Sequence, residues 1–279
     1  MKIIIHGGFF SESTTNIATK LQKQEALKDI IQQGYTYLKT HDAVETAVYT
    51  VSLLEDNPLF NAGIGSQIQS DGVIRMSAAL MDGKTLKMAG VINIENVKNP
   101  ILVALKLIPY EDRILGGKGA IDFAYKNGFT PFDTEIQQRR DEYNEKLKSS
   151  KTSTVGCVCL DENQNIAVAT STGGKGFEIP GRISDSATVA GNYANQFCGV
   201  SMTGVGEDIV SNAMAAKIVT RVTDGMSLKQ AFDKSFDELK KNNGFAGAIA
   251  IDHLGNIYHQ DSFPTMVYAS FDGNFLDIF

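Results

Sequence analysis

Thr154 lies where a charged, polar stretch of the chain gives way to an apolar run. Inside an intact chain its hydroxyl is a weak nucleophile, because no base stands beside it in the sequence. A cut between Ser153 and Thr154 would leave a free α-amino group with a pKa of about 7.7–8.0, and that amine could act as general base for the neighbouring hydroxyl. Threonine also opens many ordinary strands, so its position alone makes it only a candidate nucleophile.

The remaining short motifs favour no other common chemistry. The four histidines have no metal-ligand spacing. Gly173-Gly174 and Thr203-Gly-Val-Gly206 lack both the Lys-Ser/Thr pair of a P-loop and the complete Gly-x-Gly-x-x-Gly pattern. A serine hydrolase is not excluded, but the chain has no Gly-x-Ser-x-Gly elbow.

Several longer motifs resemble the plant-type asparaginase/isoaspartyl aminopeptidase family of N-terminal-nucleophile hydrolases. In the second half of the chain the similar segments are Thr154–Asp161, Ala167–Gly174, Pro180–Ser186 and Thr203–Glu207. In the first half they are His6–Gly8, Asn57–Gly65 and Met81–Gly83. Several long motifs in the same order are far more specific than any one of them, and they imply hydrolysis of L-asparagine and β-aspartyl (isoaspartyl) dipeptides after autocatalytic cleavage.

The resemblance implies a catalytic role for four of the matching residues. Thr154 corresponds to the nucleophile freed by cleavage after Ser153, and Thr172 to a second hydroxyl that helps to orient it. Thr203 and Gly204 correspond to the oxyanion hole. Losing one oxyanion donor typically lowers the rate by about 10²–10³.

The same resemblance implies how the substrate binds. Arg182 corresponds to the arginine that holds the substrate α-carboxylate, a role that suits the planar guanidinium fork. Asp185 corresponds to the carboxylate that receives the α-ammonium, and Gly206 lines that pocket. Asn61 corresponds to an asparagine near the nucleophile. Taken alone, Arg182 and Asp185 could also be an ordinary surface pair.

A structural sodium ion is also implied, whereas no catalytic cofactor is expected. The loop at 54–64 resembles the family's sodium-binding loop, which surrounds the ion with backbone carbonyls. The corresponding carbonyls belong to Leu54, Glu55, Asn57, Phe60, Ala62 and Ile64. Oxygen ligands suit such a hard cation.

Three departures from the family pattern leave other functions open. Ser153 stands where Gly or Asp is common, Phe9 where a small residue usually follows the His-Gly-Gly turn, and Ser77 where Asp is frequent. A cleavage-deficient relative without catalytic activity is therefore one alternative. A glycosylasparaginase-like amidase is another, although that branch usually has Asp at the position of Glu207 and is often secreted.

Apolar periodicity and turn residues predict the elements that position these residues. Strands are expected at 2–6, 73–81, 88–94, 154–160, 166–172, 187–193, 196–202, 245–251, 256–260 and 266–270. Helices are expected at 20–33 with Gly34 as the stop, from an Asp42/Glu45 capping box to Leu54, from Asn99-Pro100 onward, at 118–127, at 206–223, and at 227–241 behind a Ser227/Gln230 capping box. The polar stretch 133–151 is typical of a solvated helix or a linker.

This mixed order favours an α+β fold of stacked sheets with helices outside. Each half looks too short for a complete core, so we expect one domain over 1–279. The resemblance further implies a four-layer αββα sandwich. It also implies an α subunit of 1–153, with its linker at 133–153, and a β subunit of 154–279, assembled as (αβ)₂.

Composition narrows the partners and the compartment. The formal net charge of −6 offers little attraction to nucleic acids or anionic membranes. Three cysteines without zinc-ligand spacing are typical of buried free thiols in a reducing cytoplasm. The N-terminal apolar run is too short for a signal peptide, and no stretch approaches the ~18 apolar residues of a membrane helix. We therefore expect a cytoplasmic enzyme that acts on a small molecule.

Overall fold

The computed structural model describes residues 1–9, 17–145, 154–263 and 265–279. The helices in these ranges are Ile17–Leu38 (α1), Ala43–Glu55 (α2), Pro100–Leu107 (α3), Gly117–Lys126 (α4), Gln137–Asn144 (α5), Gly206–Ser211 (α6), Met214–Thr223 (α7) and Leu228–Lys241 (α8). The strands are Lys2–Phe9 (β1), Met76–Asp82 (β2), Lys87–Ile94 (β3), Ile114–Gly116 (β4), Val155–Leu160 (β5), Ile166–Thr172 (β6), Asn192–Ala194 (β7), Cys198–Gly204 (β8), Ala246–Asp252 (β9), Ile257–Asp261 (β10), Met266–Phe271 (β11) and Leu276–Ile278 (β12). The predicted α+β class is confirmed.

The larger sheet interleaves the two halves of the chain. Its eight strands follow the order β12-β11-β1-β5-β6-β2-β3-β4. All neighbours in it are antiparallel except β3 and β4. Strand β1 lies between β11 and β5, and β2 pairs with β6. Neither half of the chain therefore contains this sheet by itself.

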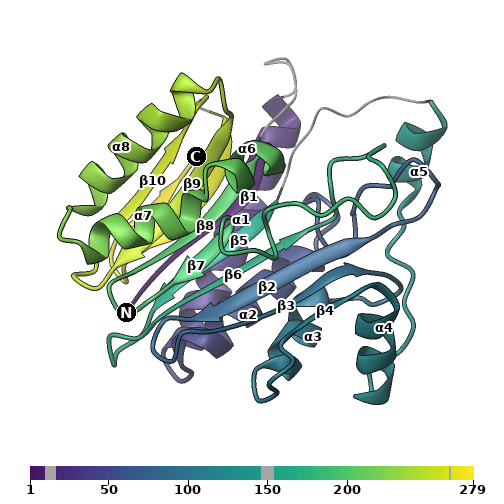
Figure 1. Cartoon of the computed structure of the whole chain (residues 1–279), viewed down its shortest axis with the longest axis horizontal. Helices are drawn as coiled ribbons and strands as arrows, with labels where there is room; N and C mark the ends of the chain where they lie inside the picture. The colour runs from purple at the N-terminus through teal and green to yellow at the C-terminus, as the bar shows by residue number, and fades with distance from the viewer. Residues whose placement is uncertain (10–16, 146–153, 264) are drawn as a thin grey trace.

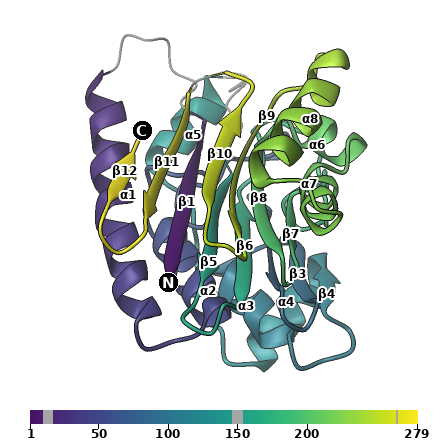
Figure 2. The ribbon, with the colours of Figure 1, turned by 90° about the vertical axis from the view of Figure 1, so that its left-hand side faces the viewer.

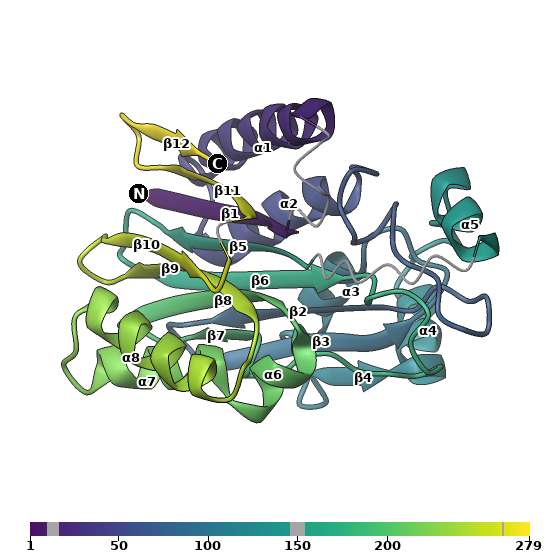
Figure 3. The same cartoon turned by 90° about the horizontal axis from the view of Figure 1, so that it is seen from above.

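A smaller sheet, with the strand order β10-β9-β8-β7, packs against the larger one. Helices α1 to α4 contact the larger sheet, with α1 along β1 and β11 (Figure 2) and α2 across β5 and β6. Helix α7 contacts β8 and α8 contacts β10 (Figure 1). Seen from above, α1 and α2 lie on one side of the strands and α7 and α8 on the other (Figure 3).

Alternation along the strands divides the apolar side chains among separate cores. Ile3 and Ile5 of β1 belong to the cluster beneath α1 to α4, whereas Ile4 belongs to the cluster between the sheets. In β5, Cys157 and Val158 divide in the same way. Along these strands, alternate residues therefore face the helices and the space between the sheets.

The predicted stop at Gly34 is wrong, because α1 continues to Leu38. A Cβ on Gly34 would lie 2.4 Å from Thr50 Oγ1 and 2.9 Å from Ile3 Cδ1. This glycine therefore allows α1 to pack closely on α2 and β1. The Ser227/Gln230 capping box is confirmed. At α2, Asp42 accepts the Glu45 N–H at 2.8 Å, which is one half of the predicted box.

Two other predictions need correction, and two strands were missed. The expected strand at 187–193 is limited to β7, because turns closed by Thr188 N–H to Asp185 O and Gly191 N–H to Thr188 O occupy the segment. The expected helix at 206–223 is divided into α6 and α7 by Ala213, whose φ is +49°. Strands β4 and β12 were not predicted. Part of the polar stretch forms helix α5, and residues 146–151 lie outside the described residues.

None of the helices in the described part of the chain is both long and apolar enough to cross a membrane.

Candidate active site

Strand periodicity brings together three threonines that the sequence singled out. Val155 pairs with Ser171, so the start of antiparallel β5 lies beside the end of β6. Thr154 directly precedes β5, and Thr172 ends β6. Both face the space between the sheets, where Thr203 meets them from β8.

The hydroxyls around Thr154 are in contact but only weakly bonded. Thr154 Oγ1 donates to Thr172 Oγ1 at 3.4 Å and lies 3.5 Å from Ser186 Oγ. The backbone nitrogen of Thr154 donates to Thr203 Oγ1 at 3.3 Å. Thr172 Oγ1 also accepts the Gly174 N–H at 3.2 Å. These long contacts leave the Thr154 hydroxyl free to find a better partner.

A buried polar group lies just below these threonines between the sheets. His6 Nε2 is 2.9 Å from Ser201 Oγ, which is 2.8 Å from Thr170 Oγ1. A Cβ on Gly156 would lie 2.0 Å from Ser201 Oγ, so only glycine fits there. Burial lowers the pKa of His6 to about 3, and the imidazole is therefore neutral at pH 7.

The Arg182 guanidinium is paired with the carboxylate of Glu207, the residue after Gly206 in the sequence. Its Nε and Nη2 donate to Glu207 Oε1 and Oε2 at 2.8 and 2.7 Å. The hydrogen bonds from Arg182 lower the pKa of Glu207 to about 2. Lys175 Nζ lies 3.8 Å from Glu207 Oε1. This bidentate pairing uses one edge of the guanidinium and leaves Nη1 for another ligand.

Asp185 is a buried carboxylate, and one of its two oxygens has no hydrogen-bond partner among the described residues. The residue is only 2% exposed, and this oxygen is Oδ2. A Cβ on Gly191 would lie 2.4 Å from Oδ2, and one on Gly206 would lie 2.9 Å from Oδ1. Burial raises the pKa of Asp185 to about 7; the Arg182 charge opposes this shift and the Glu207 charge adds to it. Such a group is ready to accept a cation.

Asn61 supports the turn behind the threonines. Its Nδ2 donates to Gly174 O, and its backbone carbonyl accepts the Gly173 N–H at 2.9 Å. Its Oδ1 accepts the Gln67 N–H at 3.0 Å. Asn61 was predicted to lie near the nucleophile. Its hydrogen bond to Gly174 connects it to the cavity, because Gly174 lines the same cavity as Thr154.

The described residues enclose a cavity of about 10 Å³ between these groups. Its lining residues are Thr154, Thr172, Gly174, Lys175, Arg182, Ser184, Asp185, Gly204 and Gly206. A space of this size accommodates about one water molecule, so an amino-acid ligand requires neighbouring groups to move aside. Ser153 lies outside the described residues.

Two of the departures from the family pattern are visible in the structure. Phe9 is buried and packs on Phe245, with ring centroids 4.5 Å apart. A Cβ on Gly247 would lie 2.9 Å from Phe9 Cζ, so that glycine makes room for the ring. Ser77 pairs with Thr172 across β2 and β6, and its Oγ accepts the Asn93 N–H at 3.1 Å.

The asparaginase family model matches residues 1–276. The chain belongs to the asparaginase family. The isoaspartyl peptidase/L-asparaginase of Synechocystis sp. is 43% identical over 98% of this chain and 88% of the relative. The protein with the same name from Nostoc sp. is 41% identical over 98% and 92%. The plant-type L-asparaginase of Pyrococcus abyssi is 34% identical over 96% and 95%. The resemblance inferred from the motifs is confirmed.

In this member of the asparaginase family, the structure adds groups that sequence reasoning did not place in the site. Ser184 and Ser186 lie within the Pro180–Ser186 motif, and their place beside Asp185 was the signal that could have found them. Glu207 was noted only as a marker of the family branch, although its place after Gly206 put it beside the substrate groups. For Lys175, the sequence contained no indication of a place in the site beyond its position after two glycines.

Proposed function

We propose that this chain hydrolyses L-asparagine and β-aspartyl dipeptides with Thr154 as its nucleophile, after cleavage of its own 153–154 bond. It is a hydrolase of the asparaginase family, whose curated relatives include isoaspartyl peptidases and L-asparaginases. One observation carries the proposal: the Thr154 hydroxyl, a fixed guanidinium and a buried unpaired carboxylate line one cavity.

Substrate recognition follows from the two charged groups. Arg182 would bind the α-carboxylate through the guanidinium edge that Glu207 leaves open. Asp185 would bind the α-ammonium through its carboxylate, whose Oδ1 lies beside Gly206 in the cavity. Gly206 lies against both side chains, since a Cβ there would be 3.0 Å from Arg182 Nη2. The two contacts fix the amino-acid backbone and leave the side-chain amide to face Thr154.

The first chemical stage forms an ester. The Thr154 hydroxyl oxygen adds to the amide carbonyl while the freed α-amine of Thr154 accepts the hydroxyl proton. Thr203 and Gly204 would stabilise the oxyanion, and Thr172 would orient the hydroxyl from 3.4 Å. The amine then gives the proton to the leaving nitrogen, the carbon–nitrogen bond breaks, and ammonia or an amino acid departs.

The second stage hydrolyses the β-aspartyl ester. Water adds to the ester carbonyl, and the same amine accepts its proton. The carbon–oxygen bond to Thr154 breaks, the threonine oxygen recovers a proton, and aspartate leaves. Each group therefore returns to its starting state after one turnover.

Maturation would divide one domain of 1–279 into an α subunit of 1–153 and a β subunit of 154–279. The interleaved larger sheet supports this proposal, because its backbone hydrogen bonds would keep the two pieces together. The sheets and their covering helices are also consistent with the four-layer αββα sandwich of N-terminal-nucleophile hydrolases. We further propose that cleaved units pair as (αβ)₂ in a reducing cytoplasm, where the three free cysteines would remain reduced.

A sodium ion would be held by the loop at 54–64. The carbonyls of Phe60, Ala62 and Ile64 accept no hydrogen bond from any described residue, and Phe60 and Ala62 are fully buried. Buried carbonyls need partners, and a hard cation supplies one. The carbonyls of Leu54, Glu55 and Asn57 each accept a backbone N–H and keep a second lone pair. The ion would fix the loop and take no part in the chemistry.

Denaturing electrophoresis with mass spectrometry tests the maturation step. Incubated wild-type protein should yield two fragments, the second beginning at Thr154, and should release ammonia from asparagine and leucine from β-Asp-Leu. Thr154→Ala should remain whole and inactive. Full turnover by Thr154→Ala would rule out the nucleophile. Preferential hydrolysis of sugar-linked asparagine would instead identify a glycosylasparaginase-like enzyme.

A further inference from the structure

We propose that Gln69, held by Arg75, and Asn93 form a clamp on Gly181 that positions Arg182 for the substrate α-carboxylate. The proposal rests on the function proposed above. None of the three clamp residues lines the cavity around Thr154, and they act on the substrate only through the loop that carries Arg182.

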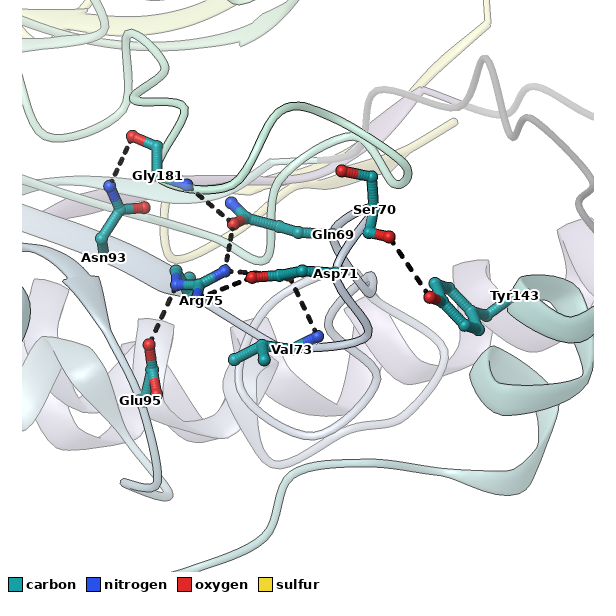
Figure 4. Close-up of polar contacts among 9 residues, drawn as sticks. All are labelled: Gln69, Ser70, Asp71, Val73, Arg75, Asn93, Glu95, Tyr143 and Gly181. Carbon is teal, nitrogen blue, oxygen red and sulfur yellow. Dashed lines mark hydrogen bonds and ion pairs between the residues drawn. The ribbon is translucent and has the colours of Figure 1, made fainter.

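Both backbone polar groups of Gly181 are held from separate elements (Figure 4). Its N–H donates to Gln69 Oε1 at 3.0 Å, and its carbonyl accepts from Asn93 Nδ2 at 2.8 Å. Gln69 lies in the loop between α2 and β2, and Asn93 lies in β3. The residue next to Arg182 is therefore tied to the first half of the chain on both sides.

Arg75 fixes the oxygen that Gly181 uses. Its Nη1 donates to Gln69 Oε1 at 2.7 Å, so this single oxygen receives both donors. The guanidinium is itself held by Glu95, which is 2.9 Å from Nε, and by Asp71, which is 3.0 Å from Nη2. Gln69 is 1% exposed, which leaves no solvent to replace a lost partner.

The apolar side chains on either side of Gly181 contribute little packing, because they point into solvent. Ile179 is 80% exposed and Ile183 is 52% exposed. Gly181 has a φ of +84°, and a Cβ on it would meet no atom within 4 Å. The hydrogen bonds to Gln69 and Asn93 therefore tie Gly181, the residue before Arg182, to the first half of the chain.

A loosened clamp should weaken α-carboxylate binding and leave the chemistry at Thr154 intact. For Gln69→Leu we expect the KM for asparagine and the Kd for L-aspartate to rise about tenfold, with kcat within about twofold of wild type. The test substrate 3-aminopropanamide is asparagine without its α-carboxylate. Its kcat/KM should be unchanged, so the selectivity for asparagine over it should fall about tenfold.

Four further variants make the test specific. Gln69→Glu keeps an acceptor for Gly181 and Arg75 and should restore the KM. Arg75→Met should act in the same direction as Gln69→Leu, and the double variant should be no worse than the more affected single variant. Tyr143→Phe removes a 3.3 Å hydrogen bond to Ser70 O in the same loop without touching Gly181, and it should match wild type.

Asn93→Gly serves as a second arm if Gln69→Leu does not fold. The φ of Asn93 is +51°, which glycine tolerates, so the substitution removes only the amide that holds Gly181. Equal losses for asparagine and 3-aminopropanamide, a fall in kcat alone, or no rescue by Gln69→Glu would each overturn the clamp. Binding of L-aspartate is measured without turnover. If wild type hydrolyses neither substrate, the proposed function fails, and aspartate affinity still decides the clamp.

Discussion

The unpaired carboxylate of Asp185 predicts that substrate affinity depends on pH. Burial raises its pKa to about 7, and only the ionised form can bind an α-ammonium. Asp185 should be ionised in about a tenth of the molecules at pH 6 and about nine tenths at pH 8. The affinity for L-aspartate should therefore increase about tenfold over this range. The α-ammonium of a free amino acid stays charged throughout, because its neighbouring carboxylate stabilises the charge more than the amide beside a peptide N-terminus does.

Asp185→Asn supplies the matched control and a second magnitude. The carboxylate is 2% exposed, so its pairing with an ammonium occurs away from water. Removing one partner of such a buried pair costs about 2–5 kcal/mol, or about 30-fold to several thousand-fold in affinity. We expect a loss in this range at pH 8 and no tenfold increase between pH 6 and 8.

Isothermal titration calorimetry with L-aspartate and fully cleaved enzyme measures both effects at constant ionic strength. Any pH dependence that remains in Asp185→Asn belongs to other groups, including the Thr154 amine. Wild-type affinity that does not change from pH 6 to 8, beside a weakened Asp185→Asn, would refute the raised pKa. Wild-type affinity in Asp185→Asn would refute the assignment of the ammonium site.

Three more outcomes follow from the site. Thr203→Val should lower kcat for asparagine by about 10²–10³, and an unchanged kcat in steady-state assays would remove this residue from the oxyanion hole. Glu207→Gln should raise the KM for asparagine several-fold and shift the pH midpoint of aspartate binding downward, because the Glu207 charge raises the pKa of Asp185; an upward shift would contradict this coupling. Gly63→Ala should cost about 1–3 kcal/mol in urea denaturation, because φ is +52° and the new Cβ would lie 2.3 Å from Glu55 O. Gly119→Ala, where a Cβ meets nothing within 4 Å, is its control, and equal stabilities would show that the loop tolerates a side chain.

The strands around Thr154 could be predicted because their signal is local. Residues 154–160 and 166–172 are apolar runs joined by a short polar turn, and β5 and β6 lie within one residue of those bounds. The candidate residues from Thr154 to Gly206, apart from Thr203, also line one cavity, although Arg182 and Asp185 come from the long segment between β6 and β7.

The errors arose where the residue pattern alone did not decide the local structure. Gly34 resembles a helix stop in sequence, but its role depends on Thr50 and Ile3, which approach it from other elements. The turns at 185–191 satisfy their backbone groups locally in a segment that looks strand-like. The pairing of Arg182 with Glu207 could not be read from spacing, because 25 positions separate the two residues.

The interleaved sheet explains how a cut chain could keep its nucleophile in place. Strand β5 is paired on both sides, to β1 through Gly156 and to β6 through Val155. A break before Thr154 removes none of these ladder hydrogen bonds, so the new chain end would start one residue from a strand that cannot shift without breaking two ladders. The register also fixes which face of the sheet Thr154 points to, because a slip by one residue would turn Thr154 away from Thr203 and Thr172. A terminal threonine on an edge strand would lack the second ladder, and its hydroxyl would be free to leave the oxyanion donors that it needs.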